Sequence, residues 1–149
     1  GSPDRDRSLT ARGEAEVDRA ARGFLMQLQR RNLPLPGRIL FSRWRRTTQT
    51  AERILECCGG ADAETLDALI PGRDAARVDD AVSRFEGFDS HLVLVSHQPL
   101  VTALIDRWLG TSGEVPALVP GAYVVLNVPV IAPGCAAIAW WAAPPDYQV

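Results

Sequence analysis

HLVLVSHQPLVTALIDRWLG, residues 91–110, joins a strand-like run to a helix-like run. The apolar residues 92–95 are too few for an independent helix, and they predict a strand that is buried on both faces. Pro99 suits the first turn of a helix, where no N–H is needed, and apolar residues then recur at helical spacing until Gly110. His97 is therefore expected between a strand end and a helix start, where open α/β sheets bind ligands and where an anion is favoured.

A second segment, RILFSRWRRTTQTA at residues 38–51, repeats this plan with arginines in the turn. One histidine at a strand end is more often a surface residue than a catalyst, so His97 alone would indicate little. Two strand-to-helix turns, one with an imidazole and one with guanidinium groups, favour a phosphate site instead. Arginine binds phosphate oxygens through paired N–H donors.

Length and composition limit the class of protein. The 149 residues predict one domain, 1–149, with a substantial core. The 16 basic and 18 acidic residues nearly balance, which argues against a nucleic-acid or membrane partner. No segment has the roughly 18 apolar residues of a membrane span, and no signal peptide is evident, so we expect a cytoplasmic protein. Three cysteines and two histidines form no metal-binding spacing, and we expect no metal, no cofactor and reduced, mostly packed thiols.

The remaining patterns alternate helices with strands. Thr10 is a predicted helix cap, and the helices are expected from Thr10 until Pro34, from 47 to Gly59, and from Asp74 to Gly87. Residues 64–69 are expected to be extended, and residues 122–128 and 135–141 to form a hairpin. This order predicts a three-layer α/β/α sandwich with a largely parallel sheet and a C-terminal β-hairpin. Folds of this kind usually begin with a strand, whereas this pattern begins with a helix.

Four segments in order resemble motifs of the histidine phosphatase superfamily, which has the phosphoglycerate-mutase-like fold. They are RSLTARG at 7–13, FSRWRRTTQTA at 41–51, LIPGRD at 69–74 and LVSHQPL at 94–100. The resemblance spans nearly the whole chain and is closest to the small bacterial phosphohistidine phosphatases. Arg43 departs from it, because the family often has proline there.

The resemblance implies phosphoryl transfer to a nucleophilic histidine, followed by hydrolysis of the phosphohistidine enzyme intermediate. The family's nucleophile lies in an Arg-His-Gly motif at the end of a leading strand, and this chain contains no such motif. We therefore expect the leading strand and its histidine to lie outside the 149 residues, upstream of Gly1.

The resemblance carries over two pocket positions, Arg46 and His97. Arg46 would hold phosphoryl oxygens, and His97, if protonated beside a phosphoryl dianion, would donate to another. Ser42 and Gln98 are further candidate substrate-binding residues, although Ser42 is equally well explained as a turn-forming serine. Asp67 is a possible general acid, and a solvated turn residue is the simpler interpretation of it.

The expected function is removal of phosphate from a phosphohistidine signalling protein, with inorganic phosphate as product. An imidazole leaving group needs less proton assistance than an alkoxide, since its conjugate acid has a pKa near ~6.5, and this favours P–N over ester substrates. Two alternatives stay open. The chain is either an inactive phosphate- or phosphoprotein-binding module, or a small-molecule phosphomonoesterase on the same fold.

Overall fold

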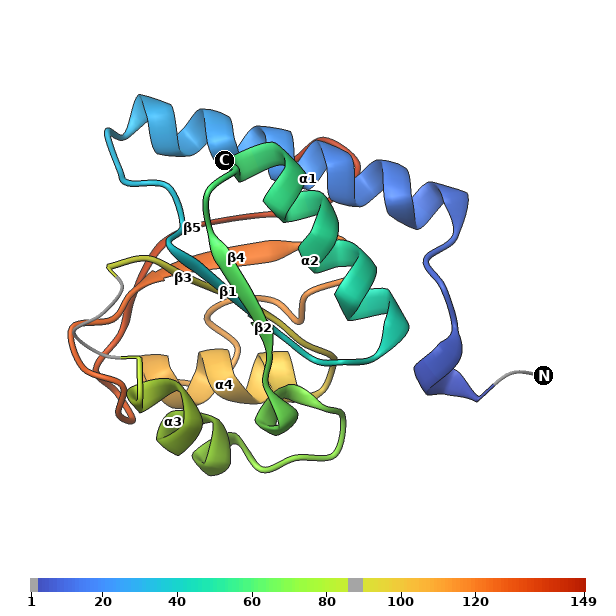
Figure 1. Cartoon of the computed structure of the whole chain (residues 1–149). Helices are drawn as coiled ribbons and strands as arrows, with labels where there is room; N and C mark the ends of the chain where they lie inside the picture. Colours follow the sequence, from blue (N-terminus) through green and yellow to red (C-terminus); the bar gives the residue numbers. More distant parts are fainter. Residues whose placement is uncertain (1–2, 86–89) are drawn as a thin grey trace.

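The computed structural model describes residues 3–85 and 90–149, and it contains both helices and strands (Figure 1). A short 3-10 helix, η1 (Asp4–Asp6), precedes the first α-helix, and another, η2 (Asp67–Leu69), follows the second strand. The α-helices are α1 (Ala11–Arg30), α2 (Arg45–Cys58), α3 (Ala75–Ser83) and α4 (Leu100–Leu109). The strands are β1 (Arg38–Phe41), β2 (Asp62–Thr65), β3 (Leu92–Val95), β4 (Tyr123–Asn127) and β5 (Ala137–Ala142).

The strands form two groups. β1 lies between β2 and β3 and is parallel to both, so that Phe41 is in register with Thr65 on one side and Val95 on the other. β4 and β5 form an antiparallel pair with an irregularity between Val125 and Leu126. The parallel sheet and the C-terminal hairpin predicted from the sequence are both confirmed.

Helices cover the strands from two sides, with α1 and α2 on one side and α3 and α4 on the other (Figure 1). The α3/α4 side is packed by a cluster that includes Leu40, Leu69, Val78 and Trp108. The α1 side is packed by Phe24 and its neighbours Leu28, Cys58 and Trp140. Layers of helix, sheet and helix are therefore present, as the alternating pattern predicted.

The prediction that residues 92–95 are buried on both faces is wrong. All four residues of β3 are half-exposed, although their neighbours Ile39 and Leu40 in β1 are fully buried. The physical reason is that β3 pairs only with β1, and within the described residues no strand pairs with its other edge. An apolar strand at a sheet edge keeps part of its surface in contact with water.

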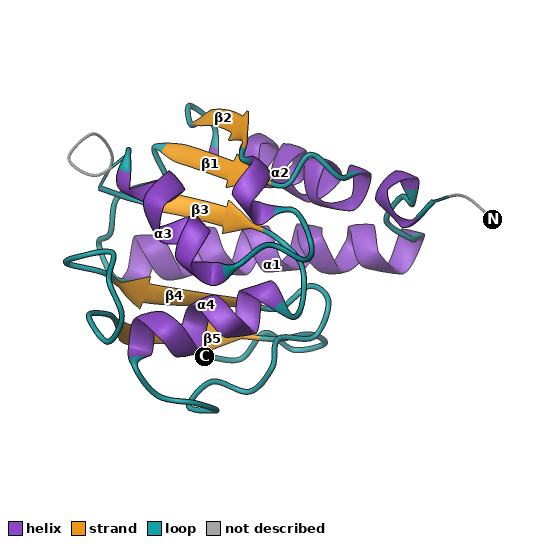
Figure 2. Ribbon diagram, turned by 90° about the horizontal axis from the view of Figure 1, so that it is seen from below, coloured by secondary structure: helices purple, strands orange, loops and turns teal. Residues whose placement is uncertain are grey.

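β3 and β4 belong to the same layer although they share no hydrogen-bonded ladder. Val93 of β3 packs with Tyr123 and Val125 of β4 against the Phe24 cluster, while Leu92 and Leu94 pack with Leu126 on the α4 side. The two strands run in opposite directions (Figure 2). Accessible surface totals 8296 Å², compared with about 7,500 Å² for a compact monomer of this mass. Among the residues that the structure describes, the second edge of β3 and the second edge of β4 have no ladder partner.

Several boundaries differ from the predictions. Residues 64–69 divide into the end of β2 and the 3-10 helix η2, because β2 starts earlier, at Asp62, where it pairs with β1. Pro99 immediately precedes α4 instead of occupying its first turn. The second helix begins at Arg45, and Gly87 lies outside the described residues.

Two further findings concern the hydropathy of the helices and the burial of the cysteines. No helix among the described residues is long and apolar enough to cross a membrane. Cys58 is buried and Cys57 half-buried, whereas Cys135 is exposed, so two of the three thiols are packed, in line with the prediction.

Candidate functional site

The turn after β1 is held rigidly by hydrogen bonds. Ser42 is fully buried, and its N–H donates to the carbonyl of Val95 at the end of β3 (3.0 Å). The hydroxyl of Thr47, in the first turn of α2, donates to the carbonyls of Ser42 (2.6 Å) and Trp44 (2.9 Å). The arrowheads of β1 and β3 point to the same edge of the sheet (Figure 2). The turn after β1 is thereby fixed beside the chain that leaves β3.

His97 lies against this turn. Its Nε2 is 2.9 Å from Oγ of Ser42, and its ring meets the Trp44 ring edge-on at a centroid distance of 4.9 Å. The Trp44 N–H contacts the same Oγ at 3.4 Å, which leaves the serine proton available for Nε2. Ser42 and Trp44 therefore hold the imidazole in one orientation.

The pKa of His97 is lowered to about 4, mainly because burial disfavours the charged ring and also because Arg46 is positively charged nearby. Asp4 opposes this shift but does not cancel it. Without an anion the ring is neutral at neutral pH. The protonated state expected from the sequence thus requires a bound dianion to raise the pKa.

Arg46 is in the first turn of α2 and lies beside the same aromatic residue. Its guanidinium carbon is 5.9 Å from the centroid of the Trp44 ring, which His97 contacts at the ring edge. Arg46 and His97 therefore open onto one site, at the carboxyl ends of β1 and β3.

The guanidinium of Arg46 is already paired with Asp4. Nη1 donates to Oδ1 at 2.9 Å and to the Asp4 carbonyl at 3.0 Å, and Nη2 lies 3.4 Å from Oδ2. This hydrogen bond is the main cause that lowers the pKa of Asp4. The Leu9 N–H donates to Oε1 of Gln49 at 2.8 Å, and this bond holds the N-terminal segment on α2. A carboxylate thus occupies the donors that a phosphoryl group would use.

The other two candidates lie at the edge of the site. The Gln98 side chain donates to the carbonyl of Leu118 (3.0 Å) and accepts from the N–H of Thr102 (3.0 Å), so its amide is used to fix the connection after α4. Asp67 is exposed, and its Oδ1 lies 4.0 Å from Nε of Arg43. Neither contact reaches His97 or Arg46.

Trp44 and Asp4 are site residues that sequence reasoning missed. Trp44 carried a signal, because a large aromatic residue stood in an otherwise polar turn. Asp4 carried none, since residues 1–7 are polar and show no periodicity. Only the fold brings η1 onto α2.

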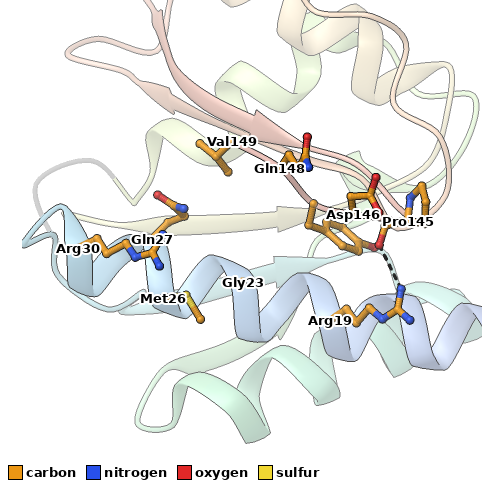
Figure 3. Close-up of a pocket in the computed structure, with 10 residues that line it drawn as sticks. Arg19, Gly23, Met26, Gln27, Arg30, Pro145, Asp146, Gln148 and Val149 are labelled. Carbon is orange, nitrogen blue, oxygen red and sulfur yellow. Dashed lines mark hydrogen bonds between the residues drawn. The ribbon is translucent and has the colours of Figure 1, made fainter.

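A separate cavity of about 710 Å³ lies between α1 and the C-terminal segment (Figure 3). Arg19 donates to the carbonyl of Pro145 across it (3.1 Å), and Met26 and Val149 contribute apolar surface. It contains none of the candidate phosphate-binding residues. Within residues 3–85 and 90–149, no group of three or more His, Cys, Asp or Glu side chains is arranged to hold a metal ion.

Comparison of the fold with solved structures finds phosphatases. The protein histidine phosphatase SixA complexed with tungstate matches with a TM-score of 0.78 and 24% identity, over 97% of this chain and 88% of that one. A putative phosphohistidine phosphatase SixA from Agrobacterium tumefaciens matches over the same shares of both chains, with a TM-score of 0.74 and 24% identity.

A mycobacterial glucosyl-3-phosphoglycerate phosphatase in complex with VO3 matches with a TM-score of 0.66 and 16% identity, over 93% of this chain and 88% of that one. No model of a protein family matches the sequence, and no curated protein matches it either. The structural likeness extends over nearly the whole chain. The chain therefore has the fold of the histidine phosphatases, phosphoglycerate-mutase-like and with a C-terminal hairpin.

Proposed function

We propose that Arg46 and His97 bind a phosphoryl group and that the protein is a phosphohistidine phosphatase. The observation that carries the proposal is that these two side chains, 51 positions apart in the sequence, flank the Trp44 ring at the carboxyl edge of a parallel sheet. A guanidinium and an imidazole there suit the charge that spreads over three phosphoryl oxygens during transfer. Tungstate and VO3, present in two of the matching structures, are oxyanions of the same kind.

In the proposed reaction, the P–N bond of a phosphohistidine protein breaks while a new P–N bond forms to a histidine of the enzyme. Water then attacks that phosphorus, its P–N bond breaks, and inorganic phosphate leaves. Arg46 holds two oxygens throughout. Ser42 keeps His97 aimed at the third oxygen, and the dianion raises the pKa of the ring so that it donates a proton to that oxygen.

The nucleophilic histidine in this proposal belongs to a strand that precedes residue 1. The edges of β3 and β4 that lack ladder partners support this assignment, since one extended segment could pair with both, parallel to β3 and antiparallel to β4. A strand parallel to β3 would end at the same edge as β3, beside His97. The second histidine within the 149 residues is unsuited to the role, because Nδ1 of His91 lies 2.8 Å from the carbonyl of Pro34, at the opposite end of β3.

The position of the candidate general acid favours a phosphohistidine substrate over a phosphate ester. Asp67, the candidate acid, is exposed and contacts Arg43 at the rim of the site. Release of imidazole requires less proton assistance than release of an alkoxide. Esters should therefore be poor substrates.

The test is turnover by a polypeptide that includes the proposed preceding strand. We expect phosphate release from a phosphohistidine protein, slow release from phosphoserine and sugar phosphates, and an acid-labile phosphoenzyme. Arg46→Ala and His97→Ala should each lower kcat/KM by roughly 10²-fold or more. Arg45→Ala and His91→Asn are the matched controls and should leave it nearly unchanged. Faster turnover of the esters would instead make the protein a small-molecule phosphomonoesterase.

The binding-module alternative is favoured for the 149 residues taken alone, because they contain no Arg-His-Gly motif. We expect this polypeptide to bind tungstate or phosphate without turning over any substrate. If the natural protein has the mass of these 149 residues only, the binding module becomes its function.

A further inference from the structure

A surface groove of about 660 Å³ lies between η2 and α3, outside the phosphate-binding residues. Three arginines line it, Arg73 just before the helix and Arg77 and Arg84 along one side of it. Asp80 is the acidic residue on the helix side of the groove. The chain as a whole carries a formal charge of −2, so this groove is a local reversal of the overall charge.

The arginines are poorly paired. Arg77 and Arg73 make no side-chain hydrogen bond or ion pair among the described residues, and Nε of Arg84 reaches only the carbonyl of Ala81 at 3.3 Å. On the opposite wall of the groove, Asp67 forms an ion pair with Arg43 (4.0 Å). Most of the guanidinium donors of the groove therefore face solvent, available to an anionic group.

The wall formed by η2 is tied directly to the two turns of the candidate phosphate site. The Leu66 N–H donates to the carbonyl of Phe41, next to Ser42, at 2.9 Å. The Ser96 hydroxyl, next to His97, donates to the carbonyl of Leu69 at 2.6 Å. One wall of the arginine groove is thus hydrogen-bonded to the residues next to Ser42 and His97.

We propose that this arginine groove docks carboxylate side chains around the phosphorylated residue of an acidic phosphohistidine protein. This proposal rests on the function proposed above, and it adds that the protein substrate is acidic around its phosphorylated residue. Rim charges of this kind steer association and select partners more than they strengthen the final complex. The groove should therefore lower KM for a protein substrate and leave kcat unchanged.

The experiment uses the 149-residue chain and four fluorescent peptides that carry a stable phosphohistidine analogue or histidine, each flanked by Glu or by Gln. Fluorescence anisotropy at low ionic strength reports binding. We expect the Glu-flanked phosphopeptide to bind about 3- to 10-fold more tightly than its Gln-flanked counterpart, as two exposed ion pairs would give. This preference should fade as salt is added.

Two sets of variants separate the groove from the phosphate site. Arg73→Ala/Arg77→Ala should abolish the preference for Glu flanks and keep the preference for phosphate. Arg46→Ala should abolish the preference for phosphate and keep the preference for Glu flanks. The matched control is Arg22→Ala/Arg30→Ala, which removes two exposed arginines of α1 and should change neither preference.

Equal affinity for the Glu and Gln flanks in the unaltered protein would overturn the groove proposal and leave the phosphatase proposal standing. A flank preference that survives Arg73→Ala/Arg77→Ala would also overturn it. Failure of the phosphate preference in the unaltered protein, by contrast, would count against the phosphate site alone.

Discussion

Oδ1 of Asp4 lies 2.9 Å from Nη1 of Arg46, so a carboxylate of the N-terminal segment occupies the arginine proposed to hold phosphate. A phosphoryl group must displace this carboxylate to use the same donors. Asp4→Asn removes the competing charge, and we expect the variant to bind tungstate or phosphate several-fold more tightly in isothermal titration calorimetry. Asp6→Asn, in the same 3-10 helix, is the control. Weaker binding by Asp4→Asn would show that Asp4 orders Arg46 and does not compete with the ligand.

The stability of the chain should fall in mildly acidic solution because of His97. Burial, with help from Arg46, lowers the pKa of its ring to about 4 in the folded protein, whereas the unfolded chain titrates near 6.5. Between these values the unfolded state binds more protons, so the free energy of unfolding decreases as the pH falls from about 6.5 towards 4. The loss should be about 1–2 kcal/mol, since the ring is half-exposed and solvent screens it.

Urea denaturation at several pH values measures this dependence. His97→Asn should flatten the curve over that range, and His91→Asn should leave it in place. Saturating phosphate should also flatten it, because the dianion raises the pKa of His97 in the folded state. A curve for His97→Asn with the slope of the unaltered protein would assign the dependence to another group.

Asp79 links two helices on the face opposite α1. The residue is 8% exposed, and its carboxylate accepts from Nε of Arg107 (2.8 Å) and from Nε1 of Trp108 (2.6 Å), both in α4. Asp79→Ala leaves the buried indole N–H without an acceptor and should lower the free energy of unfolding by about 2–3 kcal/mol. Asp80→Ala, one position along α3, should change it by less than about 0.5 kcal/mol. Thermal or urea unfolding of both variants checks the prediction.

The edges of β3 and β4 should exchange their amide hydrogens quickly in the 149-residue chain. β1 is paired on both sides, whereas β3 and β4 are each paired on one side only among the described residues. Amides that lack a ladder partner are less protected. Hydrogen–deuterium exchange should thus show slow exchange in β1 and faster exchange in β3 and β4. In a polypeptide that includes the preceding strand proposed above, β3 and β4 should become protected as well.

Unchanged exchange at β3 and β4 in such a polypeptide would mean that no preceding strand pairs with these edges. That outcome would remove the support that the two edges give to an upstream nucleophile. It would leave the hydrogen bond between His97 and Ser42 and the ion pair between Arg46 and Asp4 as described.

Local sequence patterns were sufficient to predict most elements. The apolar residues at helical spacing after Pro99 are buried, because amphipathic spacing determines which face of a helix avoids water; they are Leu100, Leu104, Ile105 and Trp108. The cap at Thr10 is also confirmed by its side-chain bond to the Gly13 N–H. His97 could be singled out because it follows a short apolar strand, and Arg46 because its segment resembles a motif of the histidine phosphatase superfamily.

Other features depend on neighbours that are distant in sequence. β3 is half-exposed although its residues are all apolar, because exposure depends on what lies beside a strand and the described chain provides a partner on one edge only. Asp4 belongs to the site because α2 passes next to η1, a contact between residues 42 positions apart. The neutral state of His97 likewise follows from burial and a nearby guanidinium. Sequence alone thus determined the elements, because these follow from local spacing, and its resemblance to a family indicated the candidate residues, whereas tertiary packing decided their exposure, partners and charge.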